Sequence, residues 1–334
     1  MTSPAPEWSG RSVAVTGAAG FIGSHLSSEL ARRGATVRAL VHYRSDGSRG
    51  LLDLLDAEEL DALEIVAGDL RDSDWVRRAL SGISCVFHLG ALIGIPYSYA
   101  SPRDVFATNV EGTLNVLEAA RAHAIERVVQ MSTSEVYGSA QRIPIDEAHP
   151  LSAQSPYAAS KTAADQLALS FLRSFGVPVA IARPFNTFGP GQSARAVVPT
   201  IILQALTRER LRLGSTDTTR DLVYVADTVA GLLAIAASES TVGQACNLAT
   251  GTETSIAEIV ATVGTITGRA LAIDPDPKRL RPEQSEVVRL VGDASRVRAL
   301  CGWVASTSLR DGLERTVAWF REHLTRYRPD EYGV

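Results

Sequence analysis

The sequence predicts an α/β protein built on a doubly wound parallel sheet, with a smaller mixed α/β lobe at its C-terminal end. Three observations support this prediction. Short β-branched runs alternate with helical patterns over the first half of the chain. A glycine-rich turn follows the first of these runs. After Pro184 the alternation loosens, and Gly, Pro and Arg cluster in NTFGPGQSARAVVP.

The expected strands and helices alternate along the chain, which favours parallel strands joined by helical crossovers. The pattern predicts strands over residues 12–17, 35–41, 63–70, 84–90, 126–134 and 178–184. It predicts helices over residues 21–34, 72–80, 101–124 and 155–176. Residues 8–184 are therefore expected to form a first domain, with a returning segment at about 221–249, and residues 185–334 a second lobe.

Composition and charge exclude several classes of function. The net charge of −4 in 334 residues gives no electrostatic case for binding nucleic acid or an anionic membrane. Cys85, Cys246 and Cys301 are scattered without metal-ligand spacing, so no metal site is expected. The N-terminus lacks a long apolar stretch, and the chain is expected to be cytoplasmic.

The glycine-rich turn has the pattern of a dinucleotide site. Gly17, Gly20 and Gly23 form GxxGxxG between the first strand and the first helix. Glycine lets the backbone turn tightly and approach a pyrophosphate, and the helix N-terminus supplies N–H groups. We therefore expect NAD or NADP to contact these glycines, together with Phe21 and Ile22 at the start of the helix.

The choice between the two cofactors depends on the end of the second strand, LVHYRSDG. No Asp or Glu stands where it would bind the ribose 2′-hydroxyl. Arg44 is either a contact for a 2′-phosphate or a solvated loop residue. Asp69 and Leu70 are expected near the adenine, although Asp69 could instead be a helix N-cap. NAD is the expected cofactor, and NADP remains open.

The fifth strand and the helix that follows it carry a candidate catalytic group. Tyr157 and Lys161 form YxxxK, a spacing that puts both side chains on one helix face. The lysine ammonium and a positively charged cofactor favour the phenolate of Tyr157, which can then accept a hydroxyl proton. Thr133, in the strand end STSE, is expected to hydrogen-bond the oxygen being oxidised.

With these motifs in place, the chain resembles the extended short-chain dehydrogenases/reductases that act on nucleotide sugars. The resemblance runs from residue 13 to about 303. It rests on TGAAGFIGSH, HLGA, TNVEGTLNVLEAA, STSEVYG, SPYAASK, RPFNTFGP, TRDLVYVAD and RPEQSEV. It implies a Rossmann domain, a small substrate domain and a homodimer formed through the two long helices that contain Asn109 and Tyr157.

The resemblance also implies substrate contacts. Asn186 is expected near the substrate diphosphate. Arg220 and Arg281 hold positions that bind phosphate or the nucleotide ribose, and Arg195 is an expected contact from the substrate lobe. The planar guanidinium group suits phosphate recognition.

Several reactions in this family begin with oxidation at C4 of the sugar, and the residues after Thr133 distinguish them. The resemblance to 4,6-dehydratases implies that Glu135 removes the C5 proton before water leaves from C6. Ser134 stands where dTDP-glucose dehydratases have an aspartic acid, and its hydroxyl is too weak an acid to replace that group directly. TSE occurs in GDP-mannose 4,6-dehydratases and in a bacterial group acting on nucleotide-linked N-acetylglucosamine in legionaminic acid synthesis, which this chain resembles most.

The same TSE form occurs in UDP-glucuronate decarboxylases. Those enzymes have a small residue after the arginine of the TR motif, where this chain has Asp221, which favours dehydration. The prediction is thus an NAD(P)-dependent nucleotide-sugar 4,6-dehydratase. A decarboxylase or a 4-epimerase is the alternative enzyme. A non-catalytic NAD(P)-binding sensor is the alternative of another class, although a sensor needs no activated phenolate.

Overall fold

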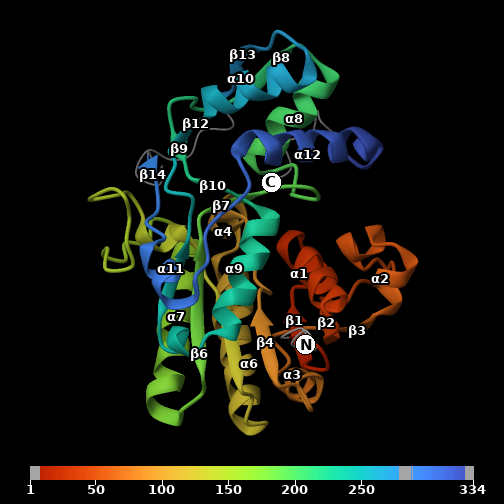
Figure 1. Cartoon of the computed structure of the whole chain (residues 1–334), viewed down its shortest axis with the longest axis vertical. Helices are drawn as coiled ribbons and strands as arrows, with labels where there is room; N and C mark the ends of the chain where they lie inside the picture. The colour runs from red at the N-terminus through yellow and green to blue at the C-terminus, as the bar shows by residue number, and fades with distance from the viewer. Residues whose placement is uncertain (1–7, 278–286, 288, 328–334) are drawn as a thin grey trace, which may run out of the picture.

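The computed structural model describes residues 8–277, 287 and 289–327. Its largest element is a seven-stranded parallel sheet with the order β11-β6-β5-β4-β1-β2-β3 (Figure 1). The crossovers run in opposite directions on the two sides of β1 and β4, which is the doubly wound arrangement. The predicted fold class is confirmed. The strands are β1 (Ser12–Thr16), β2 (Thr36–His42), β3 (Leu63–Gly68), β4 (Cys85–His88), β5 (Arg127–Met131), β6 (Val179–Pro184) and β11 (Ala245–Leu248).

Helices cover both faces of this sheet because alternate residues of each buried strand point to opposite sides. Ala14 of β1 packs in one core with residues of α3, α6 and α7, whereas Val13 and Val15 pack in another with residues of α1, α9 and α11. These helices are α1 (Phe21–Arg32), α3 (Ser73–Ala79), α6 (Gly112–Ala122), α7 (Pro156–Phe175), α9 (Val225–Ala237) and α11 (Ser295–Cys301).

The helix expected over residues 101–124 is interrupted. It consists of α5 (Pro102–Phe106), a π-helical turn (Ala107–Glu111) and α6. The extra residue of a π turn changes which side chains face the sheet, and such turns are frequent at functional sites. The turn brings Asn109 into the interior, where it is 1% exposed.

The second lobe lies beyond one end of the sheet (Figure 1) and has its own apolar core. Ile201 and Ile202, together with Ile259 and Phe320, are among its fully buried side chains. Its helices are α8 (Val197–Thr207), α10 (Ile256–Thr267) and α12 (Leu309–Glu322). Its short strands are β7 (Asn186–Phe188), β8 (Arg210–Leu213), β9 (Thr219–Arg220), β10 (Leu222–Tyr224), β12 (Thr254–Ser255), β13 (Ala272–Pro275) and β14 (Arg289–Leu290).

The chain returns from this lobe to the sheet twice. The first return consists of α9 and β11, inside the segment 221–249 that was expected to return, and β11 pairs with β6. The second is α11, which packs against α9 and β11 although the prediction placed it in the second lobe. Val297 and Trp303 of this segment are buried in the core of the first domain. A helix of seven residues has too short an apolar pattern to indicate which lobe covers it.

The remaining short elements connect these layers. They are α2 (Ala57–Asp61), α4 (Ile95–Ala100) and the 3-10 turns η1 (Gly50–Leu54), η3 (Ser134–Tyr137), η4 (Glu239–Thr241) and η7 (Leu324–Arg326). Among the described residues, no helix combines the length and apolar character needed to cross a membrane.

Candidate active site

The glycine loop between β1 and α1 is closely packed. Gly17 has φ +69°, and a Cβ atom there would lie 2.9 Å from the Cα of Gly90 at the end of β4. A Cβ on Gly23 would lie 2.2 Å from the Gly17 carbonyl oxygen, closer than any real Cβ contact. The loop therefore requires glycine at both positions, which is the condition for close approach of the backbone to a pyrophosphate.

The first turn of α1 suits an anion. Gly20 is its N-cap and makes no side-chain capping bond, and Phe21 and Ile22 begin the helix. No acidic residue stands in this turn, all of which lies within the described residues. The first N–H groups of a helix have no intrahelical partner and carry partial positive charge. This cradle of glycine and helix N-terminus fits a dinucleotide.

Asp69 and Leu70 follow β3 at the same edge of the sheet. Asp69 accepts a hydrogen bond from the Arg71 backbone N–H at 2.9 Å, and its pKa is held below its usual range by the Arg71 guanidinium. The N-cap of α3 is Asp72, which accepts from the Trp75 N–H, so Asp69 does not cap that helix. The Leu70 carbonyl is held by Asn115 at 2.8 Å.

Arg44 lies in the loop after β2 and is more than half exposed. Its guanidinium pairs with Asp46 at 3.0 Å. The Asp46 carboxylate already pairs with the guanidinium that a 2′-phosphate would need. Its negative charge would also repel that phosphate.

The end of β5 leads directly into the predicted catalytic residues. Thr133 is the N-cap of η3, and its hydroxyl accepts a hydrogen bond of 3.2 Å from the Glu135 N–H. Ser134 is buried, and Glu135 is half-buried. A single 3-10 turn therefore presents the three side chains of TSE at the carboxyl edge of the sheet, where ligands bind in open α/β sheets.

The YxxxK pair lies in the first two turns of α7, and Ser155 caps that helix by accepting from the Ala158 N–H at 3.1 Å. Tyr157 and Lys161 are 8% and 3% exposed. Burial raises the pKa of Tyr157, the hydrogen bond with Thr133 lowers it, and the nearby charge of Glu135 raises it. The structure thus brings Thr133 and Glu135 to Tyr157, and Lys161 lies one turn further along the same face of α7.

Burial lowers the pKa of Lys161 to about 8, and the Asp165 carboxylate acts in the opposite direction. Asp165 lies one turn beyond Lys161 on α7 and is fully buried. It accepts a hydrogen bond from Ser132 at 2.8 Å and pairs with Arg183 of β6 at 3.0 Å. Sequence reasoning missed Asp165, whose spacing of four residues from Lys161 was a visible signal.

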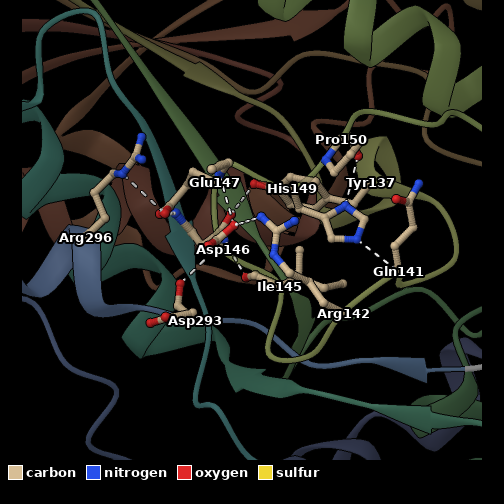
Figure 2. A network of polar contacts seen from close by, with 12 residues as sticks. Tyr137, Gln141, Arg142, Ile145, Asp146, Glu147, His149, Pro150, Asp293 and Arg296 are labelled. Atoms are coloured by element: carbon tan, nitrogen blue, oxygen red, sulfur yellow. Dashed lines mark hydrogen bonds and ion pairs between the residues drawn. The ribbon is translucent and has the colours of Figure 1, made fainter.

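A polar network fixes the connection between η3 and α7 (Figure 2). Tyr137 donates a 2.7 Å hydrogen bond to Asn247 of β11, and the Asn247 N–H donates to Glu147 at 2.8 Å. The side chain of Glu147 is 3% exposed, and its burial raises the pKa of the carboxyl, which pairs with Arg296 of α11 at 3.3 Å. His149 accepts from the Gln141 N–H at 2.9 Å. The two catalytic motifs are therefore tied to the side of the sheet formed by β11 and α11.

Asn109 is a second residue that sequence reasoning left without a site role. From the π turn, its side chain accepts from the Leu92 N–H at 2.7 Å and donates to the Leu92 carbonyl at 3.0 Å. It also donates to Ser160 Oγ at 2.9 Å, next to Lys161. The asparagine connects the loop after β4 with the catalytic helix.

The structure locates three of the four predicted substrate-binding residues. Asn186 begins β7, and its N–H donates to the Asp221 carbonyl at 3.0 Å, beside the buried Arg220 of β9. Arg195 is exposed in the loop before α8. Arg281 lies outside the described residues. Asn186 and Arg220 belong to different small sheets, and the hydrogen bond to Asp221 places Asn186 next to the residue that follows Arg220.

The Asp221 carboxylate connects two separate backbone segments. Its fully buried carboxylate accepts hydrogen bonds from the Thr250 N–H and hydroxyl, at 2.8 and 2.7 Å. It also accepts from the N–H groups of Gly251 and Gly292, at 2.9 and 3.2 Å. Since these bonds occupy both carboxylate oxygens, we attribute Asp221 to the fold, and its identity gives little support for dehydration over decarboxylation.

The described residues contain no group of three or more His, Cys, Asp or Glu side chains arranged to hold a metal ion. His88, in β4, is buried between the hydroxyls of Thr16 and Thr113, at 2.8 and 3.1 Å. Burial lowers the pKa of His88 to about 3, so its imidazole is neutral.

Comparison with known proteins places this geometry among enzymes of nucleotide sugars. The family model described as GDP-mannose 4,6 dehydratase matches residues 14–316. The UDP-glucose 4-epimerase of Mycolicibacterium smegmatis is 33% identical over 318 residues, covering 92% of this chain and 97% of the epimerase. UDP-glucuronic acid decarboxylase 1 of Xenopus tropicalis is 30% identical over 334 residues, covering 96% of this chain and 74% of the decarboxylase.

A solved structure agrees with these matches. The dTDP-glucose 4,6-dehydratase DesIV of Streptomyces venezuelae, with NAD and TYD bound, superposes with a TM-score of 0.85 at 31% identity. The alignment covers 95% of this chain and 99% of that enzyme. Three different reactions therefore occur among relatives of nearly equal similarity, and overall similarity does not distinguish them.

Proposed function

This chain belongs to the GDP-mannose 4,6 dehydratase-like family of extended short-chain dehydrogenases/reductases, and from that premise we propose that it is an NAD-dependent nucleotide-sugar 4,6-dehydratase. The family contains dehydratases, epimerases and decarboxylases of nucleotide sugars, so the chain is an enzyme of this class. The observation that carries the finer assignment is the carboxylate of Glu135 beside Tyr157, whose pKa it raises by its charge.

We assign NAD to the cradle formed by Gly17, Gly20 and Gly23, with Phe21, Ile22, Asp69 and Leu70 around it. The bound NAD in the DesIV structure supports this choice over NADP. The ion pair between Arg44 and Asp46 supports it too, because Asp46 would oppose a 2′-phosphate. When bound, NAD supplies a hydride acceptor for C4 of the sugar and a hydride donor for C6.

Tyr157 is the base for oxidation at C4. Its buried phenol needs a positive neighbour to ionise near neutral pH, because burial raises its pKa. We assign this role to the Lys161 ammonium, which lies one turn further along the same face of α7. Thr133 is hydrogen-bonded with Tyr157 and lies within reach of the same sugar oxygen. The phenolate accepts the O4 proton as C4 becomes a ketone.

Glu135 then acts on C5. The C4 ketone acidifies the neighbouring C5–H bond, and a carboxylate can remove that proton. In its protonated form Glu135 can pass the proton to the C6 hydroxyl, which leaves as water. A solvent proton then adds at C5 when the hydride returns to C6, and Tyr157 releases its proton to solvent. The net reaction is loss of one water.

Ser134 takes the position of the aspartic acid of dTDP-glucose dehydratases. A serine hydroxyl cannot protonate a leaving group, which is why this mechanism gives that step to Glu135. We assign to Ser134 a hydrogen bond with the C6 oxygen. Asn186 and Arg220, together with Arg195 and Arg281, are assigned to the diphosphate and nucleotide of the substrate, where guanidinium groups suit phosphate.

A homodimer in the cytoplasm also belongs to this proposal. The helical region that contains Asn109 packs against α7, and Tyr99 and Phe106 leave large apolar side chains 39% and 41% exposed next to it. Exposed aromatic side chains suit an interface. Light scattering on the purified protein should give twice the chain mass, and Phe106→Arg should give a monomer.

The assignment of Glu135 is tested by Glu135→Gln. This variant should retain C4 oxidation and lose elimination, so bound cofactor should accumulate in its reduced form and absorb in the near ultraviolet. Glu126→Gln is the matched control, because Glu126, immediately before β5, has a 70% exposed side chain. Normal turnover by Glu135→Gln would remove Glu135 from the mechanism.

A further inference from the structure

We propose that Asp165 is a positioning residue of the Tyr157–Lys161 pair, keeping the Lys161 ammonium charged on the helix face that it shares with Tyr157. The importance of that charge for turnover rests on the proposed function, whereas the effect of Asp165 on Lys161 is a property of the folded chain alone. Four observations support the proposal.

The first is geometric. Tyr157, Lys161 and Asp165 follow one another at intervals of four residues on α7, so their side chains share one face of the helix. All three are buried, and Asp165 is fully buried. A carboxylate and an ammonium one helical turn apart in a dry environment interact far more strongly than at a surface.

The second is the hydrogen bonding of the carboxylate. Ser132 Oγ donates to Asp165 Oδ2 at 2.8 Å, and Arg183 donates to the same oxygen through Nε at 3.1 Å and Nη2 at 3.0 Å. The other oxygen, Oδ1, is buried and accepts no hydrogen bond within the described structure. A buried carboxylate oxygen left without a hydrogen bond is costly, which calls for a cation close by.

The third is the charge balance of the cluster. Arg183 is shared, because its Nη1 also donates to the Tyr137 hydroxyl at 3.0 Å. Arg183 and Lys161 are the two cations that act on Asp165, since both charges lower the pKa of its carboxyl against the effect of burial. Removing Asp165 would take the anion away from two buried cations, of which Lys161 is the one that can lose its proton.

The fourth is composition. Of the 33 basic residues in the chain, Lys161 and Lys278 are the two lysines. A chain that uses arginine almost everywhere has, at position 161, the basic side chain whose proton affinity responds to its surroundings. Its ammonium is therefore the group that a neighbouring carboxylate can control.

Other titratable groups around the cluster do not replace Asp165. The imidazole of His88 is neutral, and Glu135 acts on the Tyr157 hydroxyl. Burial lowers the pKa of Lys161, and the Asp165 charge is what raises it. The charged or titratable side chains facing this cluster are Tyr157 on α7, Glu135 and Tyr137 on η3, His88 on β4 and Arg183 on β6.

The small number of lysines makes a direct test possible. In a Lys278→Arg background, protein labelled with ¹³C at lysine Cε has a single lysine signal, that of Lys161. Its titration is followed by NMR with saturating NAD in every sample. Asp165→Asn should lower the pKa of Lys161 by about 1–3 units, the usual effect of losing a nearby opposite charge. Ser132→Ala, which removes one hydrogen bond to Asp165 but no charge, should leave it within a few tenths of a unit.

A folded Asp165→Asn variant whose Lys161 titrates like that of the parent would overturn the proposal. If Asp165→Asn does not fold, the double variant Asp165→Asn with Arg183→Gln removes both partners of the buried ion pair, which is milder than leaving one of them unpaired. The pKa of Lys161 should again be lower than in the parent, because the Asp165 charge raises it, and an unchanged pKa would overturn the proposal equally. No substrate is present in these titrations, so their outcome is independent of which nucleotide sugar the enzyme converts. With any sugar that is turned over, Asp165→Asn should shift the alkaline limb of the pH–rate profile to lower pH, and Ser132→Ala should not.

Discussion

The side chain of Asn109 donates a 2.9 Å hydrogen bond to Ser160, the residue immediately before Lys161. Because Asn109 stands in a π-helical turn and also holds both backbone polar groups of Leu92, it fixes the loop after β4 against α7. The orientation of Lys161 therefore depends on a contact between two helices as well as on the helix that carries it.

The glycine loop should tolerate no side chain at Gly23. Gly23→Ala places a Cβ atom 2.2 Å from the Gly17 carbonyl oxygen, so the loop must shift and NAD affinity should fall by at least about tenfold, which corresponds to about 1.4 kcal/mol. Gly82→Ala is the control, since Gly82 has φ +75° but open space around it. Calorimetric titration with NAD compares the two, and equal affinities would contradict the role of the loop.

Tyr157→Phe should bind NAD and nucleotide sugar normally but lose turnover. In the proposed mechanism the Tyr157 phenolate accepts the O4 proton, and general-base groups contribute roughly 10²- to 10⁴-fold to rate. Steady-state kinetics together with calorimetric binding separate these effects. A near-normal kcat in this variant would remove Tyr157 from the mechanism.

Turnover should decline as pH rises through the pKa of Lys161. Burial lowers that pKa to about 8. Below it the ammonium is charged and stabilises the Tyr157 phenolate, whereas above it the charge and the stabilisation are lost. The logarithm of kcat should therefore fall on the alkaline side of about pH 8. A profile that keeps rising to pH 10 would show that the lysine charge is not required.

Asp221→Ser should destabilise the fold without changing the product. Serine cannot reach the donors of Thr250, Gly251 and Gly292, and each buried donor left unsatisfied costs about 1–3 kcal/mol. The free energy of unfolding should drop by about 3 kcal/mol in denaturant titrations, against less than about 0.5 kcal/mol for the exposed control Asp74→Ala. A switch in product would make Asp221 a determinant of the reaction after all.

The sequence predicted the parts of the site that depend on local spacing. The GxxGxxG loop, the TSE turn and the YxxxK pair are short patterns attached to recognisable strands and helices, and the structure brings the last two together. Asp165 escaped notice because its partners are distant in the sequence: Ser132 follows β5 and Arg183 lies in β6. The π turn at Asn109 leaves no mark in the apolar pattern, which continues through α6.

The C-terminal part of the chain was harder to predict for a related reason. Short strands such as β9 and β14 contain two residues each, too few to show a period. Asp221 looked like a marker of reaction type because its sequence position follows Arg220. Its four backbone and side-chain donors, from residues 250–251 and 292, became visible only with the fold.

The measurement that tests the central proposal most directly is mass spectrometry of reactions run in deuterated water. The substrates are UDP- and GDP-linked N-acetylglucosamine, GDP-mannose, dTDP-glucose and UDP-glucuronate, each incubated with the purified enzyme and without added reductant. We predict that one of the hexose or N-acetylhexosamine nucleotides loses one water and gains one solvent deuterium at C5, giving a 4-keto-6-deoxy sugar. Loss of carbon dioxide from UDP-glucuronate, or a product of unchanged mass, with no water lost from any hexose, would contradict the dehydratase assignment.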